Sequence, residues 1–556
     1  MTRRALLRIL AAVTVAGSVG VTTTPAFAAN YVPISGSGST WSQNAIDQWR
    51  RDVNQFGLQI NYAGTGSSDG RNQFRSGTVD FAVSEIPYGI TQGGNPDPLP
   101  QRPFAYMPIV AGGTSIMYNL QIGGRRVTNL RLSPEAVAKI FTGVVKQWND
   151  PLIAKDNPGL TLPARRIVPV VRSDGSGTSA QFTAYMASQQ PALWNTYCGK
   201  AGLPKPCGTL SQYPVLPGSG FTAQAGSLGV AGYVSQSNNI GTITYVEYSY
   251  ALNAGFPVAK LLNAAGYYIE PTASSVAVAL QKAQINPTTL TADLSQVYTY
   301  SDPRTYPMSS YSYMIVPTST ASNFSTDKGR TLAAFAKYFL CEGQKKAPLL
   351  GYSPLPINLV QAGFTQVKRI PGAAVAAITI ASCDNPTFSK GGGNLLAKTA
   401  PQPKACDKAG GLSQCPNGTG GAANVATAVK NGSTGGSGGG GSGNGTGNGT
   451  GTGTTGGGGS VGTNGGTGTT GTGGATGTNG ATGSDPLTGG SGDGTGSGDG
   501  TGTGDTQNVA ASNPITIGSG GGLTSPTFAA LAILALVGVI VVPPLVFGVL
   551  RRGGSA

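Results

Sequence analysis

The chain has 556 residues, of which 88 are glycine, and a formal net charge of +14. Its length predicts two or more packed units. Many of the glycines, however, fall between Pro416 and Thr524, where apolar side chains are almost absent. Such a stretch cannot bury enough surface to offset the entropy of ordering it, so we expect the folded part to precede it. Histidine is absent, which excludes His-dependent catalytic triads and His-ligated zinc.

The first 28 residues have the features of a secretory signal peptide. Arginines at positions 3, 4 and 8 precede an apolar run, and Ala26-Phe27-Ala28 matches the small-residue pattern of a cleavage site. We therefore expect cleavage after Ala28.

The next part of the chain alternates helix and strand signals. Trp41 to Phe56 has apolar residues at helical spacing, Leu58 to Tyr62 alternates as a strand, Gly64 to Gly70 is a predicted turn, Asn72 to Arg75 a short helix and Val79 to Val83 a buried strand. This order is typical of an α/β domain, in which ligands bind at the carboxyl ends of the strands.

A second region repeats the same scheme. Helices are predicted at Pro134 to Phe141 and Ser179 to Ser188, and strands at Ile167 to Val171, Ile240 to Tyr250 and Tyr311 to Val316. A half-buried strand is our interpretation of Tyr245, Tyr248 and Tyr250, in preference to a stacking platform for a sugar or base. The two regions predict two α/β lobes, the first formed by residues 29–115 and 265–390 and the second by residues 116–264.

The rest of the chain is expected to hold the protein at a membrane. Residues 391–525 are interpreted as a low-complexity linker and residues 526–552 as a transmembrane anchor. Phe528 to Leu550 comprises 23 uncharged, mostly apolar residues, enough to cross a hydrocarbon core of ~30 Å. Arg551-Arg552 would remain cytoplasmic, which leaves the folded part at the cell surface or in the wall. A glycolipid-anchor signal is the alternative.

Six cysteines in an exported chain predict disulfides. Cys198 with Cys207 and Cys406 with Cys415 are close enough in sequence to pair locally, which would leave Cys341 with Cys383. This is one of about 15 possible connectivities.

Three glycine-serine turns each precede a predicted helix: Gly36 to Trp41, Gly64 to Gly70, and Arg172 to Thr178. A helix start presents unpaired N–H groups and the positive end of the helix dipole, so it favours an anion. Taken singly, each turn is more simply an ordinary helix cap. Together, and with an arginine capable of bidentate contacts, they favour one oxyanion bound by several helix starts.

The order and spacing of these motifs resemble the phosphate-binding proteins of bacterial high-affinity phosphate ABC transporters, in the periplasmic-binding-protein superfamily. The resemblance covers about residues 31 to 365. It also includes Asn61 to Ser68, Val79 to Ser84, Ile140 to Gly143 with Gln147 to Asp150, and Tyr245 to Tyr248. It implies a two-lobed type II fold with hinge strands.

The resemblance also implies the phosphate ligands. Thr40 and Trp41 would bind through the first turn and Ser67 through the second, while Arg172, Ser176, Gly177 and Thr178 would bind from the other lobe, with Asp174 holding the guanidinium of Arg172. Trp41 stands where the family usually has Phe. Glu85 stands where the family usually has an Asp that accepts the proton of HPO4.

A carboxylate in an anion site repels its ligand unless that ligand brings a proton to donate, as phosphate does and sulfate at neutral pH does not. We therefore expect Glu85 to select against sulfate. Without the resemblance, a solvated or Arg-paired surface carboxylate is the simpler interpretation of Glu85.

The expected protein is a solute-binding protein that captures inorganic phosphate and delivers it to an ABC permease. No catalysis, cofactor, metal or nucleic-acid partner is expected. A wall-associated phosphatase and an adhesin of the same fold are the alternatives.

Overall fold

The computed structural model describes residues 31–92, 94–373, 383–388 and 393–430, which all belong to one compact unit. The expected signal peptide, residues 1–28, and the expected anchor, residues 526–552, lie outside the described residues, as does most of the expected linker. No helix in the described ranges is long and apolar enough to cross a membrane.

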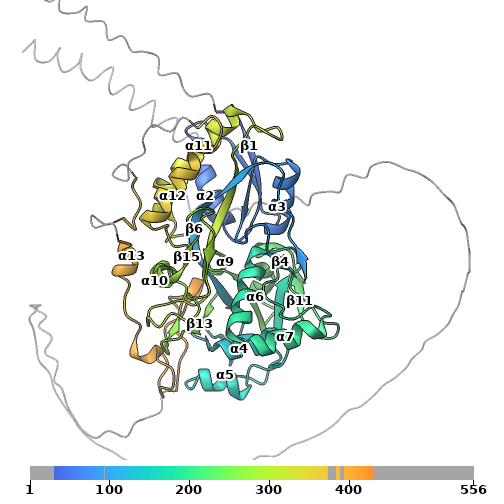
Figure 1. The fold of residues 1–556 in the computed structure, drawn as a ribbon. Helices are drawn as coiled ribbons and strands as arrows, with labels where there is room; N and C mark the ends of the chain where they lie inside the picture. The colour runs from blue at the N-terminus through green and yellow to red at the C-terminus, as the bar shows by residue number, and fades with distance from the viewer. Residues whose placement is uncertain (1–30, 93, 374–382, 389–392, 431–556) are drawn as a thin grey trace, which may run out of the picture. The chain divides into compact units, whose positions relative to one another are not determined.

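The first lobe is built on a sheet of order β17-β3-β1-β2. Strands β1 (Ile34–Gly38), β2 (Ile60–Ala63) and β3 (Phe81–Ser84) are parallel, and β17 (Ser309–Pro317) runs antiparallel to β3. Figure 1 shows α2 (Gln43–Asn54), α11 (Thr326–Leu340) and α12 (Ile357–Val367) together in this lobe. Helix α2 confirms the predicted amphipathic helix, because its buried residues are Ala45, Ile46, Trp49 and Val53.

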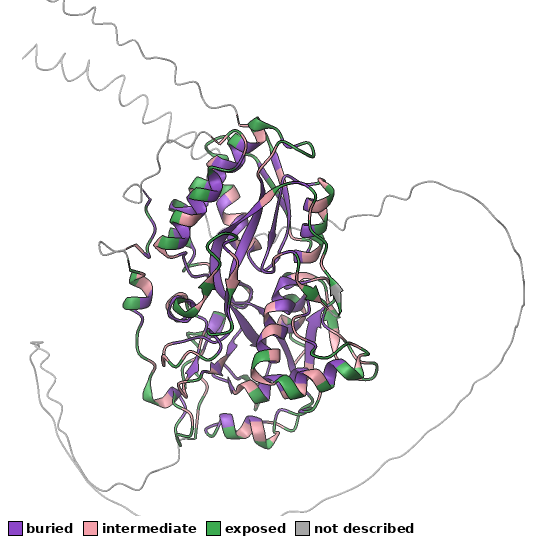
Figure 2. Cartoon of the chain, in the orientation of Figure 1, coloured by how far each residue is buried: buried purple, intermediate pink, exposed green. Residues whose placement is uncertain are grey.

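The second lobe repeats the arrangement around β10 (Val168–Arg172), which lies parallel between β11 (Thr222–Gln224) and β12 (Thr242–Glu247). Its helices are α4 (Pro134–Phe141), α5 (Pro151–Asp156), α6 (Gly177–Gln189), α7 (Pro191–Lys200) and α8 (Gly226–Ser235). Most strand residues of both lobes are buried, whereas the helices also carry exposed faces (Figure 2).

The long strand β6 (Phe104–Tyr118) connects the two lobes. Its first part, up to Gly113, pairs with β17, and its last part, from Thr114, pairs with β12. The polypeptide therefore passes from one lobe to the other in an extended, hydrogen-bonded strand, as the predicted hinge strands require.

The remaining elements are short. The strands are β4 (Thr91–Gln92), β5 (Asn95–Pro96), β7 (Gln121–Ile122), β8 (Arg125–Arg126), β9 (Arg131–Leu132), β13 (Val258–Leu262), β14 (Tyr268–Ile269), β15 (Gln284–Ile285) and β16 (Ala292–Asp293), and the helices are α3 (Ser67–Ser76), α9 (Tyr248–Asn253), α10 (Ala273–Ala279) and α13 (Leu395–Lys398). Four short 3-10 helices also lie in the described residues: Leu280–Lys282, Glu342–Lys346, Ala405–Asp407 and Gly420–Ala422.

Two local predictions were wrong. The predicted strand from Ile240 to Tyr250 ends at Glu247, and Tyr248 and Tyr250 lie on α9, where a Glu247 carboxylate oxygen accepts the N–H of Ser249 as a helix cap. The predicted turn from Gly64 to Gly70 already contains the start of α3 at Ser67. In both cases a helix begins inside a segment whose composition favours strand or turn, so composition alone did not indicate the helix start.

The linker boundary predicted at residue 391 was also wrong, since residues 393–430 pack against the folded part. Thr419 bonds to the backbone of Thr128 and Val258, and Gln414 donates to the carbonyl of Asn129. Asp407 pairs with Lys260 at 2.8 Å. Composition misled here because directed polar contacts and a few small apolar side chains, such as Ala397 and Ala400, hold this segment in place.

The three disulfides pair as predicted: Cys198 with Cys207, Cys341 with Cys383, and Cys406 with Cys415. The third closes a loop within residues 393–430 and adds a covalent constraint to a segment with few apolar side chains.

Candidate functional site

The predicted site residues lie at the carboxyl ends of parallel strands from both lobes. Thr40 and Trp41 follow β1, Ser67 follows β2 at the start of α3, and Glu85 follows β3. Arg172 ends β10. Since parallel strands present their carboxyl ends at one edge of a sheet, the topology brings these residues to facing edges of the two lobes.

Arg172 is only 2% exposed, and Asp174 fixes the orientation of its guanidinium. Its Nε donates to Oδ1 of Asp174 at 2.7 Å, and its Nη2 forms a second, short contact with Oδ2. Burial acts to raise the pKa of Asp174, but the hydrogen bonds and charge of Arg172 and the N–H of Gly226 outweigh it, so the pKa lies below its ordinary value. The predicted role of Asp174 in orienting the guanidinium is consistent with this bidentate pair.

The other predicted ligands of the second lobe form the first turn of α6. Ser176 is the N-cap, and its Oγ accepts the N–H of Ser179 at 3.1 Å. Gly177 and Thr178 follow, and Nη1 of Arg172 lies 3.4 Å from Oγ1 of Thr178. A cation and the positive end of a 13-residue helix therefore lie side by side.

Glu85 is buried in the first lobe and makes three hydrogen bonds with serine hydroxyls. Oε1 accepts from Ser39 at 2.6 Å and from Ser312 at 2.8 Å, and Oε2 accepts from Ser67 at 2.9 Å. Burial raises the pKa of Glu85, and the three serine hydroxyls oppose that rise. The interpretation of Glu85 as a surface carboxylate is wrong, because it is 1% exposed.

The first turn places Thr40 against the second lobe. Oγ1 of Thr40 lies 2.8 Å from Oγ of Ser227, and its carbonyl oxygen accepts the hydroxyl of Tyr250 at 2.6 Å. The backbone N–H of Trp41, predicted to bind the ligand, donates instead to Oγ of Ser39 at 2.9 Å. A ligand at this N–H has to replace that serine oxygen.

The structure adds three residues that the sequence reasoning missed: Ser39, Ser227 and Ser312. Ser227 contacts Arg172 Nη1 at 3.2 Å as well as Thr40, and it stands in the first turn of α8. Gly226-Ser227 was a signal of the same kind as the three turns that were recognised. Ser312 lies within β17 and offered no motif.

Glycines allow the two lobes to approach closely around these residues. A β-carbon on Gly66 would lie 2.6 Å from Oδ2 of Asp174, and one on Gly177 would lie 2.0 Å from Oε2 of Glu85. The backbone N–H of Ser68 also donates to the carbonyl of Gly175 at 3.0 Å. Loops of the two lobes are therefore in direct contact at the site.

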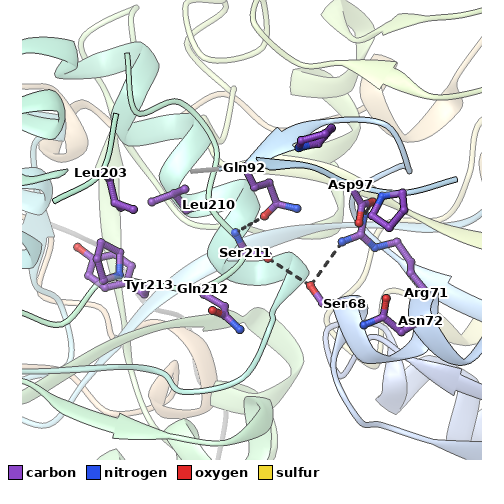
Figure 3. Close-up of a pocket in the computed structure, with 13 residues that line it drawn as sticks. Ser68, Arg71, Asn72, Gln92, Asp97, Leu203, Leu210, Ser211, Gln212 and Tyr213 are labelled. Atoms are coloured by element: carbon purple, nitrogen blue, oxygen red, sulfur yellow. Dashed lines mark hydrogen bonds and ion pairs between the residues drawn. The ribbon is translucent and has the colours of Figure 1, made fainter. Parts of the chain in front are cut away.

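A pocket of about 490 Å³ lies beside this contact, between the two lobes (Figure 3). Ser68 and Arg71 come from the first lobe, and Ser211 and Tyr213 from the second. Oγ of Ser68 donates to Oγ of Ser211 at 3.2 Å, and Oε1 of Gln92 accepts the N–H of Ser211. Ser68 lines the pocket and directly follows Ser67 in the chain, so the pocket borders the candidate site.

The part of the chain that the structure describes contains no cluster of three or more His, Cys, Asp or Glu residues that could hold a metal ion. The site chemistry available in these ranges is that of Arg172 paired with Asp174, helix N-termini, hydroxyls and the carboxyl group of Glu85.

Comparison with known proteins identifies the family of the chain. Residues 21–342 match the family model of the PBP superfamily domain. The chain is 34% identical to the phosphate-binding protein PstS of Xylella fastidiosa, over 59% of this chain and 83% of that protein. It is 29% identical to the PstS protein of Methanocaldococcus jannaschii, over 60% and 85%.

Solved structures include a phosphate-binding protein from Stenotrophomonas maltophilia, with a TM-score of 0.43 and 18% identity over 60% of this chain and 93% of that one. The family assignment rests on the sequence matches alone. On these matches, the chain belongs to the PstS-like phosphate-binding proteins of the periplasmic-binding-protein superfamily.

Proposed function

We propose that this chain captures inorganic phosphate between its two lobes and releases it unchanged. The observation that carries the proposal is the placement of Arg172, fixed by Asp174, beside the first turn of α6 and opposite Ser67 and Glu85 of the other lobe. A tetrahedral oxyanion needs donors from several directions, and these elements supply them from both lobes.

The second lobe supplies most of the positive potential. Arg172 offers a guanidinium whose Nη1 points to Thr178 and Ser227. Gly177 and Thr178 offer the N–H groups of a helix start, whereas the N–H of Ser176 donates to the carbonyl of Ser211 at 2.8 Å, so Ser176 would contribute its hydroxyl. Thr40, Trp41 and Ser67 would complete the shell from the first lobe. Because Arg172 is buried, its interaction with an anion is little screened by water or salt.

Glu85 gives the site its selectivity in this proposal. As an ionised acceptor, its carboxylate accepts a proton donated by phosphate and repels sulfate, which carries none at neutral pH. Selection therefore acts against the wrong anion as well as for the right one.

Calorimetric titration of residues 29–430 with phosphate and then with sulfate tests the proposal. Tight binding of phosphate supports it, provided that the same protein does not hydrolyse a phosphate ester in a separate assay. Turnover of an ester would favour the phosphatase, and binding of neither anion would favour an adhesin. Neither alternative has a specific observation in its favour among the described residues.

We further propose that the captured phosphate is delivered to an ABC permease, and that the protein is anchored at the cell surface through residues 526–552. The sequence pattern supports the anchor, and membership of the PstS-like proteins supports the permease. Lys430, the last described residue, bonds through its N–H to the carbonyl of Gly159 in the second lobe at 2.9 Å. Fractionation of cells expressing the full chain, with and without residues 526–552, tests the anchor.

A further inference from the structure

Glu85 and a bound phosphate need the same groups. The hydroxyl of Ser67 has one proton, and it donates that proton to Oε2 of Glu85 at 2.9 Å. Ser67 is a predicted phosphate ligand. Its hydroxyl cannot donate to both acceptors at once, so a phosphate oxygen that uses this hydroxyl has to take the hydrogen bond away from Glu85.

The carboxylate also extends beyond its own lobe. Oε2 of Glu85 lies so near Gly177 that a β-carbon there would be 2.0 Å away, and Oγ of Ser67 would be 2.5 Å away. Gly177 is the first residue of α6, where the positive end of the helix dipole favours a negative oxygen. The carboxylate thus lies directly against the helix start at which phosphate is proposed to bind.

The other carboxylate oxygen holds Glu85 in this pose. Oε1 accepts from Ser39 and Ser312, and the backbone carbonyl of Glu85 accepts from Nε2 of Gln181 on α6 at 2.9 Å. Two serines of the first lobe therefore hold the side chain where it meets Ser67 and Gly177, and Gln181 of the second lobe holds the backbone of the same residue.

We propose that Glu85 is an internal competitor of phosphate: its carboxylate takes the place of one ligand oxygen between Ser67 and the start of α6. This rests on the proposed function and adds a regulation of the same site. Binding requires the carboxylate to give up Ser67 and withdraw from Gly177, so the length of the side chain sets the affinity for phosphate. An aspartate, one methylene shorter, keeps the proton acceptor while vacating the contact with α6.

The test is calorimetric titration of the secreted protein with inorganic phosphate, using the parent, Glu85→Asp, Glu85→Gln and the control Glu270→Asp. Glu270 bonds to Tyr248 and Gly420, away from the site. We expect Glu85→Asp to bind phosphate about tenfold more tightly, on the scale of one hydrogen bond of ~1.4 kcal/mol. Glu85→Gln, which keeps the length, should not gain affinity, and Glu270→Asp should match the parent.

Equal or weaker phosphate binding by a folded Glu85→Asp protein would overturn the competition while leaving the proposed function intact. Failure of the parent and of all variants to bind phosphate would instead overturn the proposed function, and the competition with it. If Glu85→Asp does not fold, sulfate titration of Glu85→Ala and Glu85→Gln distinguishes competition for space from charge repulsion. Competition for space predicts tighter sulfate binding by Glu85→Ala than by Glu85→Gln, whereas charge repulsion alone predicts equal binding.

Discussion

The hydroxyl of Thr40 in the first lobe lies 2.8 Å from the hydroxyl of Ser227 in the second, and the N–H of Ser227 donates to the same threonine oxygen at 3.1 Å. Ser227 also contacts Nη1 of Arg172. One serine thus links the predicted ligand of one lobe to the predicted cation of the other. The contact between the two lobes and the orientation of Arg172 therefore depend on the same residue.

Replacing Ser227 by alanine removes that link and leaves Arg172 with one fewer partner. We expect phosphate affinity to fall about tenfold, the usual scale of one hydrogen bond to a charged group. Calorimetric titration measures it, with Ser235→Ala, at the other end of α8, as the control. Equal affinities for both variants would place Ser227 outside the coupling.

Arg172 is expected to be the most sensitive position. Arg172→Ala removes a buried cation and leaves Asp174 unpaired, so phosphate binding should weaken by about 3–5 kcal/mol. Arg172→Lys keeps the charge but loses the bidentate geometry, and its loss should be smaller yet substantial. Dissociation constants within a factor of two of the parent would remove this arginine from the site.

Glu85→Gln tests anion selection separately. Because an amide donates as well as accepts, it should reduce the preference for phosphate over sulfate. Competition binding with the two anions gives the ratio directly. An unchanged ratio of the two affinities would mean that Glu85 does not accept a hydrogen bond from the proton of phosphate.

How far the sequence predicted this site depends on the kind of contact. Arg172, Asp174 and the start of α6 are local in sequence, so the motif from Arg172 to Thr178 contains both the residues and their geometry. Ser312 is far from Glu85 in sequence and meets it only because β17 pairs with β3. Such a partner depends on strand register, which periodicity alone does not fix.

The fold shows the same division. Helices α2 and α4 were predicted because their apolar spacing and caps are local. Residues 393–430 were assigned to the linker because the contacts that hold them, such as Thr419 with Thr128 and Gln414 with Asn129, are single polar pairs between distant segments. Amino-acid composition does not predict hydrogen bonds between residues far apart in the sequence.

A buried carboxyl group beside the lobe connection predicts a pH dependence of stability. Glu247 pairs in register with Thr114, where β6 passes between the lobes, and its Oε1 has no hydrogen-bond partner among the residues that the structure describes. Burial raises its pKa well above the ordinary value, despite the N–H of Ser249. The folded protein therefore binds a proton that the unfolded chain releases above its own pKa of about 4.3. Stability contributed by this proton is present below that pH and is lost as the pH rises through the folded pKa.

Glu247→Gln removes this titration and keeps the shape of the side chain. The free energy of unfolding at pH 8 should exceed that of the parent, and its fall between pH 5 and pH 8 should become shallower. Urea unfolding at several pH values measures both, with the exposed Glu135→Gln as control. Parallel curves for Glu247→Gln and the parent would mean that Glu247 does not take up a proton on folding.

The packing of residues 393–430 changes where the chain can be shortened without loss. Ending the protein after Lys430 removes none of the described contacts, so phosphate affinity and melting temperature should match those of the full chain. Ending it at residue 390 removes the partners of Asn129, Lys260 and Thr128, which are buried or partly buried. Each unsatisfied buried group costs about 1–3 kcal/mol, so the shorter protein should be destabilised by at least about 3 kcal/mol. Urea unfolding of the two truncated proteins measures the difference. Equal stabilities would mean that residues 393–430 lie on the folded part without stabilising it.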